Sequence, residues 1–336
     1  MNNPYVKTLE PVWRDTKDVR VNEEKLQELI KDMRQKKEKG ELIIPAWAVP
    51  NIHPPIDCGL KEWVDYVCWI NTVNFAFTNF EPPYNKFAIE YPKGNFLSGS
   101  AAMAASFMRA KKEGIPIFEA ETMNTITWSE INYIFRPVDE EHKMPMLQKR
   151  WEIIREAADD LLGMYDGQWL NLFRWSNWRA FDYGKGFNYQ GIIKKLVTNF
   201  FSFGDTREYG GQTLEFHKRA QLLVMMYHGR AANSGGRFPL IKDINDIGPI
   251  ADYDVPKALH FLGVLGYSSR LESAIENHSV IVVGHPWETE NRLGQCYVMW
   301  RICEELSINM AQADYYIWEM GRKSKSPHIL VPTTSY

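Results

Sequence analysis

The chain has 336 residues, of which 45% are hydrophobic, 24% are charged and 13% are aromatic. These proportions are typical of a soluble globular protein and exclude intrinsically disordered, collagen-like and coiled-coil classes. Because 39 basic residues face 42 acidic ones, the formal net charge is −3, and no global field favours duplex nucleic acid or an anionic membrane as the partner. The 12 tryptophans are an excess that stability alone does not require.

The cysteines Cys58, Cys68, Cys296 and Cys303 form no C-x-x-C pair and are too few for a disulfide framework. The N-terminal residues lack the charged and apolar regions of a secretory signal, and no stretch approaches the roughly 18 consecutive apolar residues of a membrane span. We therefore expect a cytoplasmic protein without a membrane-spanning segment.

Hydrophobic periodicity predicts helices through most of the chain. The expected helices cover residues 22–39, 60–77, 101–112, 127–137, 146–162, 214–228, 256–265, 269–277, 290–306 and 311–321.

One β-hairpin interrupts this helical pattern, with strands at 86–91 and 96–97 around a Pro-Lys-Gly-Asn turn. It is the only strand pair that the pattern supports. Residues 175–191 combine three glycines with several aromatic residues and no clear period, which predicts a long loop or insertion. Since no linker or internal repeat separates these elements, we predict a single, mainly all-α domain over residues 1–336.

Several common chemistries have no motif in this sequence. Dinucleotide-binding, Walker and H-E-x-x-H patterns are absent. His217 and His228 share a helix face but lie about three turns, roughly 16 Å, apart, which is too far to bind one metal. Cys296 and Cys303 are interpreted as core residues rather than as nucleophiles. We expect neither a cofactor nor a metal.

Two carboxylates precede the helix predicted from Pro256, a residue type favoured in a first helical turn. Asp254 is the better placed N-cap. Asp252 then has no evident structural role, although it lies in an apolar stretch where an ionised carboxylate is costly unless it has a partner or a task. Asp252 is therefore the leading catalytic candidate.

Two further clusters could bind a ligand. Lys218 and Arg219 lie near the start of a predicted helix, where the helix dipole also favours a phosphate or carboxylate; an ordinary solvated first turn is the alternative. In the helix predicted at 311–321, acidic and aromatic side chains three and four residues apart could hold a flat polar ring, with core packing as the alternative. Asn74 is a polar amide within an apolar helical stripe.

Four runs resemble those of the queuosine salvage proteins, queuosine 5′-phosphate N-glycosylases. They occur in the family's order and at similar separations: Val-Asn-Phe-Ala-Phe at 73–77, Lys-Arg-Ala-Gln at 218–221, Ala-Asp-Tyr at 251–253 and Asp-Tyr-Tyr-Ile-Trp at 314–318. The resemblance extends from about residue 17 to residue 336. It implies a helical fold related to the helix-hairpin-helix DNA glycosylases, and a hydrolase that splits queuosine 5′-phosphate into queuine and ribose 5-phosphate.

The resemblance also implies roles for individual residues. Asp252 matches the catalytic aspartate, and Asp314, Tyr315, Glu319 and Ile250 match base-binding positions. The residues expected to contact the substrate are His53, Asn74, Phe75, Lys218, Arg219, Ile250, Tyr253, Asp314, Tyr315, Trp318 and Glu319.

In the expected mechanism, the Asp252 carboxylate stabilises the positive charge that develops on the ribose and orients the attacking water. Asp314 and Glu319 accept hydrogen bonds from the base, and Lys218 with Arg219 holds the 5′-phosphate. The expected partner is this small nucleotide, without a stable nucleic-acid complex. A nucleic-acid glycosylase acting on a flipped base, which the near-neutral charge disfavours, and a non-catalytic binder of a modified base are the alternatives.

Overall fold

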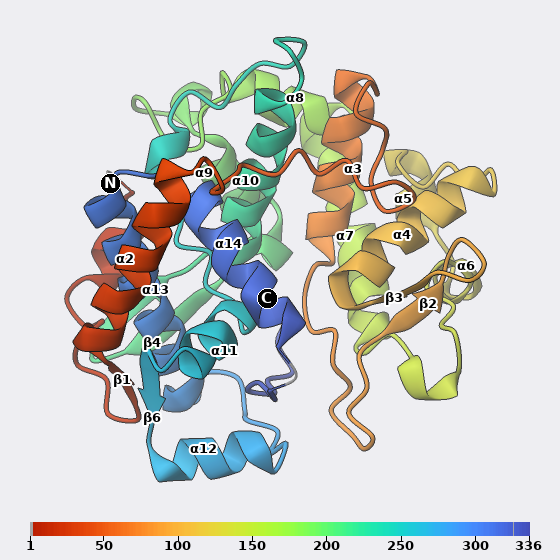
Figure 1. Ribbon diagram of the computed structural model, residues 1–336. Helices are drawn as coiled ribbons and strands as arrows, with labels where there is room; N and C mark the ends of the chain where they lie inside the picture. The colour runs from red at the N-terminus through yellow and green to blue at the C-terminus, as the bar shows by residue number, and fades with distance from the viewer. Residues whose placement is uncertain (1–2, 325) are drawn as a thin grey trace.

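The computed structural model describes residues 3–324 and 326–336, and helices dominate it, as predicted (Figure 1). The α-helices are α1 Val6–Leu9, α2 Glu23–Glu38, α3 Leu60–Thr72, α4 Gly99–Lys112, α5 Ala120–Thr125, α6 Trp128–Ile134, α7 Leu147–Tyr165, α8 Trp169–Trp175, α9 Ile192–Asn199, α10 Lys218–Ala232, α11 Asp254–Phe261, α12 Ser269–Glu276, α13 Pro286–Leu306 and α14 Met310–Lys323. Of these, α1, α5, α8 and α9 lie outside the predicted ranges.

The strands form three two-stranded antiparallel sheets in the described part of the chain. They are β1 Val19–Val21 with β6 Leu265–Tyr267, β2 Ala88–Glu90 with β3 Phe96–Ser98, and β4 Thr206–Tyr209 with β5 Gln212–Glu215. The predicted hairpin is β2–β3 and is confirmed, but the prediction of only one strand pair was wrong. The β4–β5 hairpin turns through Gly210 and Gly211 at φ 59° and 75°, a conformation that glycine adopts without strain.

Local sequence signals account for several helix boundaries. Asn22 caps α2 by accepting a hydrogen bond from the Lys25 N–H, and the apolar stripe of this helix is buried. Thr127 caps α6 in a reciprocal capping box with Glu130, as expected. By contrast, α3 ends at Thr72 rather than continuing to residue 77, and α10 begins only at Lys218, because Leu214 belongs to β5.

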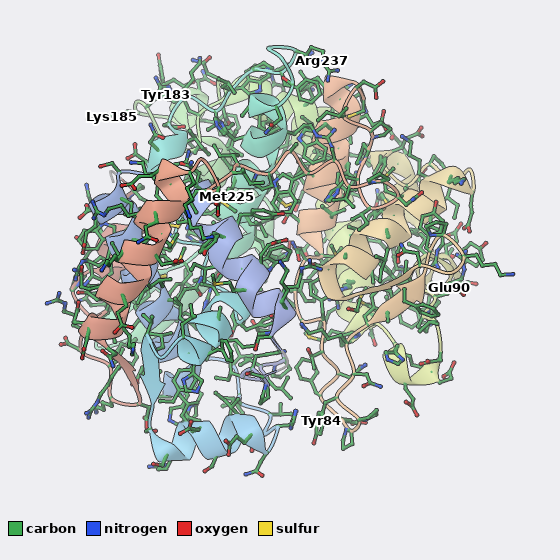
Figure 2. The ribbon with its side chains drawn as sticks, in the orientation of Figure 1. Tyr84, Glu90, Tyr183, Lys185, Met225 and Arg237 are labelled. Atoms are coloured by element: carbon green, nitrogen blue, oxygen red, sulfur yellow. The ribbon has the colours of Figure 1, made fainter. Side chains whose placement is uncertain are left out.

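The predicted loop at 175–191 is largely confirmed. From residue 176 to Gly191 it holds one short 3₁₀ turn, Phe187–Tyr189, and Tyr183 lies at the periphery, away from the cavity residue Met225 (Figure 2). The neighbouring tryptophans serve the core. Trp169 packs edge-on against Trp69 with ring centroids 5.3 Å apart, and Trp178 Nε1 donates to the Tyr227 hydroxyl at 2.8 Å.

Two groups of elements face each other across the molecule (Figure 1). One contains α4, α6 and the β2–β3 hairpin, and the other contains α2, α11, α13 and α14. A cavity opens between them, and α3 and α10 contribute to its walls. In the described part of the chain, no helix combines the length and hydrophobicity of a membrane span. All four cysteines are buried and unpaired, and burial raises the pKa of Cys296 and of Cys303 to about 12, in keeping with core residues.

Candidate active site

The cavity between the two groups has a volume of about 940 Å³, and segments distant in the sequence meet at it. Its acidic lining residues are Asp252, Asp254, Asp314 and Glu319, and its basic ones are Lys86, Lys218, Lys257 and Arg322. A space of this size is typical of a site for a small ligand.

Asp252 occupies the N-terminal end of α11. Its Oδ1 accepts hydrogen bonds from the backbone N–H groups of Asp254 at 3.0 Å and Val255 at 3.1 Å. Asp252 is thus the capping side chain, so the assignment of the cap to Asp254 was wrong, and Asp252 does have a structural role. Its second oxygen, Oδ2, lies 3.9 Å from Lys218 Nζ at the cavity. One oxygen of this carboxylate therefore caps the helix, and the other lies near Lys218.

The electrostatic surroundings of Asp252 raise its pKa. Burial disfavours the charged carboxylate, and the neighbouring Asp254 adds to this, while Lys218 and the two capping N–H groups act in the opposite direction. Asp252 is thus a stronger proton acceptor than an exposed aspartate.

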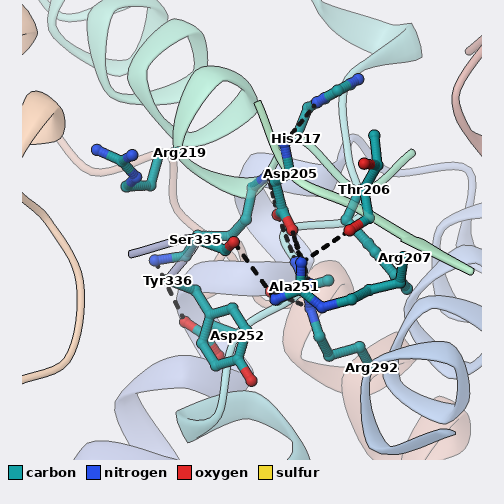
Figure 3. A network of polar contacts seen from close by, with 12 residues as sticks. Asp205, Thr206, Arg207, His217, Arg219, Ala251, Asp252, Arg292, Ser335 and Tyr336 are labelled. Carbon is teal, nitrogen blue, oxygen red and sulfur yellow. Dashed lines mark hydrogen bonds and ion pairs between the residues drawn. The ribbon is translucent and has the colours of Figure 1, made fainter. Parts of the chain in front are cut away.

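The loop that carries Asp252 is fixed by two side chains of α13. Gln295 accepts from the Asp252 N–H at 3.0 Å and donates to the Ile250 carbonyl at 2.5 Å. Arg292 donates to the Ala251 carbonyl at 3.2 Å and binds both oxygens of Asp205 at 2.9 and 2.5 Å (Figure 3). The sequence analysis did not identify Gln295, Arg292 or Asp205, because no local pattern links these side chains to residues 250–252.

Asp314 and Lys218 are charged side chains that act on Asp252 from other elements of the cavity wall. Asp314 projects from α14, is 6% exposed, and its Oδ1 has no hydrogen-bond partner among the described residues. Burial and the nearby Asp252 raise the Asp314 pKa well above its usual value, and Lys218 only partly offsets them. Burial lowers the pKa of Lys218, against the attraction of both carboxylates. An unpartnered carboxyl oxygen in a cavity wall is a site for a ligand donor.

Aromatic rings form one wall of the cavity. Tyr315 lies edge-on to Trp47, with centroids 5.8 Å apart, and near-parallel to Trp318 at 6.1 Å. His53 Nδ1 accepts from the Val49 N–H at 3.1 Å, and burial together with Arg230 lowers the His53 pKa to about 3. The imidazole is therefore neutral at pH 7, with its proton on Nε2. These groups suit a flat heterocycle.

Most predicted substrate-binding residues line this cavity. They are His53, Asn74, Lys218, Ile250, Tyr253, Asp314, Tyr315, Trp318 and Glu319, together with the catalytic candidate Asp252.

Phe75 and Arg219 lie outside the cavity lining. The Arg150 and Arg219 guanidinium groups both lie over the Phe75 ring, 4.2 and 5.3 Å from its centroid. Arg219 is 1% exposed and donates to the carbonyls of Asn71, Thr72 and Ser202, so it fixes the end of α3 instead of facing solvent.

Known proteins are similar in sequence to this chain over most of its length. A family described as "Queuosine salvage protein" matches residues 52–334. A protein of Bos taurus is 30% identical over 327 residues, which cover 93% of this chain and 91% of that protein. One from Sphaerobacter thermophilus is 29% identical over 84% of this chain and 85% of its own length. Both are named queuosine 5′-phosphate N-glycosylase/hydrolase. This chain belongs to the queuosine salvage protein family.

Proposed function

We propose that this protein hydrolyses the N-glycosidic bond of queuosine 5′-phosphate, releasing queuine and ribose 5-phosphate and so returning queuine to tRNA modification. The names of its relatives support this reaction. The structural observation that carries the proposal is the free Oδ2 of Asp252 in a cavity bordered by aromatic rings.

Cleavage of the glycosidic bond leaves the bonding electron pair on the base and positive charge on C1′ and O4′ of the ribose. Asp252 Oδ2 stabilises that charge more strongly in the transition state than in the ground state. The same oxygen accepts a proton from the attacking water, whose oxygen forms the new bond to C1′; this proton then passes to the base, which leaves as neutral queuine and restores the carboxylate. Lys218 acts as a positioning residue, because its ammonium keeps this carboxylate charged.

Asp314 and the neighbouring aromatic side chains bind the base. Queuine has no ring N7, so protonation at that atom cannot activate it as a leaving group. The unpartnered Asp314 oxygen accepts an N–H of the base, and Tyr315 and Trp318 border its flat ring. Without the Asp314 carboxyl, the buried N–H of the bound base would have no acceptor. Asp314 is therefore a source of substrate specificity.

We further propose that the chain forms a single cytoplasmic domain of the helix-hairpin-helix glycosylase type and that it acts on the free nucleotide. The net charge of −3 supports a nucleotide over a nucleic acid as the substrate.

The test compares Asp252→Asn with Asp252→Ala. Asparagine is also a favourable N-cap, so the first variant keeps α11 capped but removes the negative charge. We expect it to unfold at nearly the wild-type temperature and to lose 100-fold or more of its release of queuine, measured by chromatography, in line with the roughly 10²- to 10³-fold effect of removing one transition-state stabiliser. Alanine removes both roles and should in addition cost about 1 kcal/mol of stability.

Wild-type turnover by Asp252→Asn would refute the catalytic role. Release of queuine from queuosine-containing tRNA at a rate equal to that from the nucleotide would favour the flipped-base alternative. Tight queuine binding without formation of ribose 5-phosphate by the unaltered protein would identify a binder.

A further inference from the structure

The cavity is electrostatically asymmetric. Around Lys218 three carboxylates, those of Asp252, Asp314 and Asp254, favour its ammonium form, and a single cation, Arg219, opposes it. Around Lys86 two further cations, Lys257 and Arg322, oppose the charge of this lysine, while Asp254 and Asp252 favour it. An incoming dianion is therefore repelled at the Lys218 end and attracted to the Lys86 end.

Lys86 carries an ammonium group that the described residues leave without a hydrogen bond. Its closest carboxylate oxygen is Asp254 Oδ1, 3.8 Å away, and that oxygen also binds Lys257 Nζ at 2.9 Å. Burial lowers the Lys86 pKa despite the attraction of Asp254. At 3.8 Å, Asp254 Oδ1 lies beyond hydrogen-bond distance of Lys86 Nζ, so the donors of this ammonium have no acceptor among the described residues.

The N-terminus of α4 adjoins Lys86. Ser98, Gly99, Ser100 and Ala101 line the cavity, and a β-carbon on Gly99 would lie 3.8 Å from Lys86 Cδ. The first N–H groups of a helix have no acceptor within the helix. In α4 the Gly99 N–H donates to the Phe87 carbonyl at 2.8 Å, and Ser98 at the N-cap supplies no side-chain oxygen, which leaves the N–H groups of Ser100 and Ala101 for a ligand. Gly99 has φ +61°, which lets the chain enter the helix without a bulky residue over this end.

We propose that the 5′-phosphate of the substrate binds between the ammonium of Lys86 and the N-terminal turn of α4, with Lys257 as a second cation. Free N–H groups, the positive end of a helix dipole and a lysine without a hydrogen bond form a standard oxyanion site. This assignment rests on the proposed function for the identity of the ligand, and it replaces Lys218 and Arg219 as the phosphate-binding pair. Because the charge of Asp252 acts on both Lys86 and Asp314, the substrate would extend across the cavity with its ribose at Asp252 and its base at Asp314.

The decisive variant is Ser98→Asp. An aspartate at this N-cap accepts the free N–H groups of α4 and places a negative charge where the phosphate would bind. We expect the variant to unfold at the wild-type temperature or higher, while its affinity for ribose 5-phosphate, measured by calorimetry, falls at least 10-fold. Better folding combined with weaker binding is a result that a damaged structure cannot produce.

Lysine variants test the cation. Lys86→Met should weaken ribose 5-phosphate binding about 10- to 100-fold, as expected for the loss of a hydrogen bond to a charged group. Lys149→Met is the matched control, because Lys149 is an exposed lysine that pairs with Glu152 on α7, outside the cavity lining. Lys218→Met should reduce the affinity much less than Lys86→Met.

A second measurement needs no variant. Ribose 5-phosphate should protect Lys86 from acetylation, followed by mass spectrometry, more strongly than it protects Lys149. Equal protection of the two lysines, unchanged affinity in Ser98→Asp, or a greater loss in Lys218→Met than in Lys86→Met would overturn the proposal. These outcomes are separate from the proposed reaction: an inactive wild-type protein that binds ribose 5-phosphate through Lys86 would refute the reaction alone.

Discussion

Asp252 combines a structural contact with the catalytic role proposed for it. Its Oδ1 is committed to the N–H groups of Asp254 and Val255, and this fixes the carboxylate plane so that Oδ2 faces the cavity. Pairing with Lys218 then sets the charge state of the free oxygen. Because Lys218 favours the carboxylate, its removal has a predictable effect on the pH dependence of catalysis.

We expect Lys218→Met to move the acidic limb of the kcat/KM profile to higher pH. In the wild type, activity falls as Asp252 gains a proton, and burial places this titration above the ordinary value of 3.8. Without Lys218, the carboxylate loses its stabilising cation, so its pKa rises further. Rate measurements across the acidic range check this shift. A limb that stays in place in a folded variant would show that Lys218 does not act on Asp252.

Asp314 should lower the stability of the protein at neutral pH. Its pKa is raised in the folded state, so the folded protein holds this proton more tightly than the unfolded chain does. The associated stability is complete below the ordinary value of 3.8 and is lost as the pH rises through the folded pKa. We therefore expect Asp314→Asn to unfold at a higher temperature than the wild type at pH 7, by about 1 kcal/mol of stability, and to bind queuine more weakly.

Thermal scans at several pH values test that expectation. The advantage of Asp314→Asn should shrink as the pH falls to well below 3.8, where the wild-type carboxyl is neutral in both the folded and the unfolded state. A constant difference at every pH would mean that the effect does not come from ionisation. A stabilised variant with undiminished queuine affinity would remove Asp314 from base recognition.

At the scale of elements, buried arginines fix the irregular segments that line the cavity. Arg150 and Arg219 bind carbonyls in and just after the last turn of α3, near Asn74. Arg230 does the same for the loop that carries Trp47 and His53. Loops have no ladder of their own, so a guanidinium with five donors can satisfy several of their carbonyls at once.

Arg230→Met should loosen this loop selectively. Arg230 donates to the carbonyls of Ala46 at 2.8 Å, Pro55 at 2.8 Å, Pro54 at 3.0 Å and Trp47. Leaving these acceptors unpaired should cost on the order of 3 kcal/mol, and Lys at this position should not restore it, because one ammonium cannot reach all four carbonyls. Urea titrations give the stability, and hydrogen exchange should accelerate in residues 46–58. Unchanged exchange there would contradict the role of Arg230.

Periodic elements could be predicted from the sequence, and contacts between distant segments could not. The helices α2 and α6 and the β2–β3 hairpin were predicted from local signals, and each was confirmed. The β1–β6 pair joins Val19 to Tyr267, so no local pattern could indicate it. Likewise, the end of α3 depends on Arg219 from α10, and Lys-Arg at a helix start looks the same in sequence whether it is solvated or buried.

The sequence signal that predicted residues of the candidate site was a polar side chain within an apolar stretch. Asn74 and Asp252 stood out in this way, and both line the cavity. Lys86 and the N-terminal turn of α4 gave no such signal, since a lysine before a strand and a Ser-Gly-Ser turn are ordinary on a protein surface. Their significance comes from the way in which the fold brings them together.

At the scale of the whole molecule, Asp205 joins three elements to the loop that carries Asp252. It precedes β4, accepts the Lys218 N–H of α10 at 3.1 Å, and pairs with Arg292 of α13, which in turn holds the Ala251 carbonyl (Figure 3). Both side chains of the ion pair are 1% exposed. A charge in this position is stabilising only while its partner is also charged.

Acid should therefore unfold the protein partly through Asp205. Although burial opposes ionisation, Arg292 lowers the Asp205 pKa to about 2 in the folded state, against an ordinary value of 3.8. The pair then contributes its full stability above pH 3.8, and this stability is lost as the pH falls toward 2. Asp205→Asn should cost about 3–5 kcal/mol at pH 7, because it leaves the Arg292 charge buried and unpaired, and its stability should change less than that of the wild type between pH 4 and pH 2.

Replacing both partners separates stability from catalysis. The double variant Asp205→Leu with Arg292→Met removes both charges, so it should recover part of the stability lost in Asp205→Asn. It also removes the donor to the Ala251 carbonyl, and the loop that positions Asp252 loses one of its anchors. We expect urea midpoints to improve relative to Asp205→Asn while queuine release stays at least 10-fold below that of the wild type, since small displacements of a positioned group are costly for turnover. If turnover recovered together with stability, the ion pair would serve folding alone and Gln295 would suffice to hold the loop that carries Asp252.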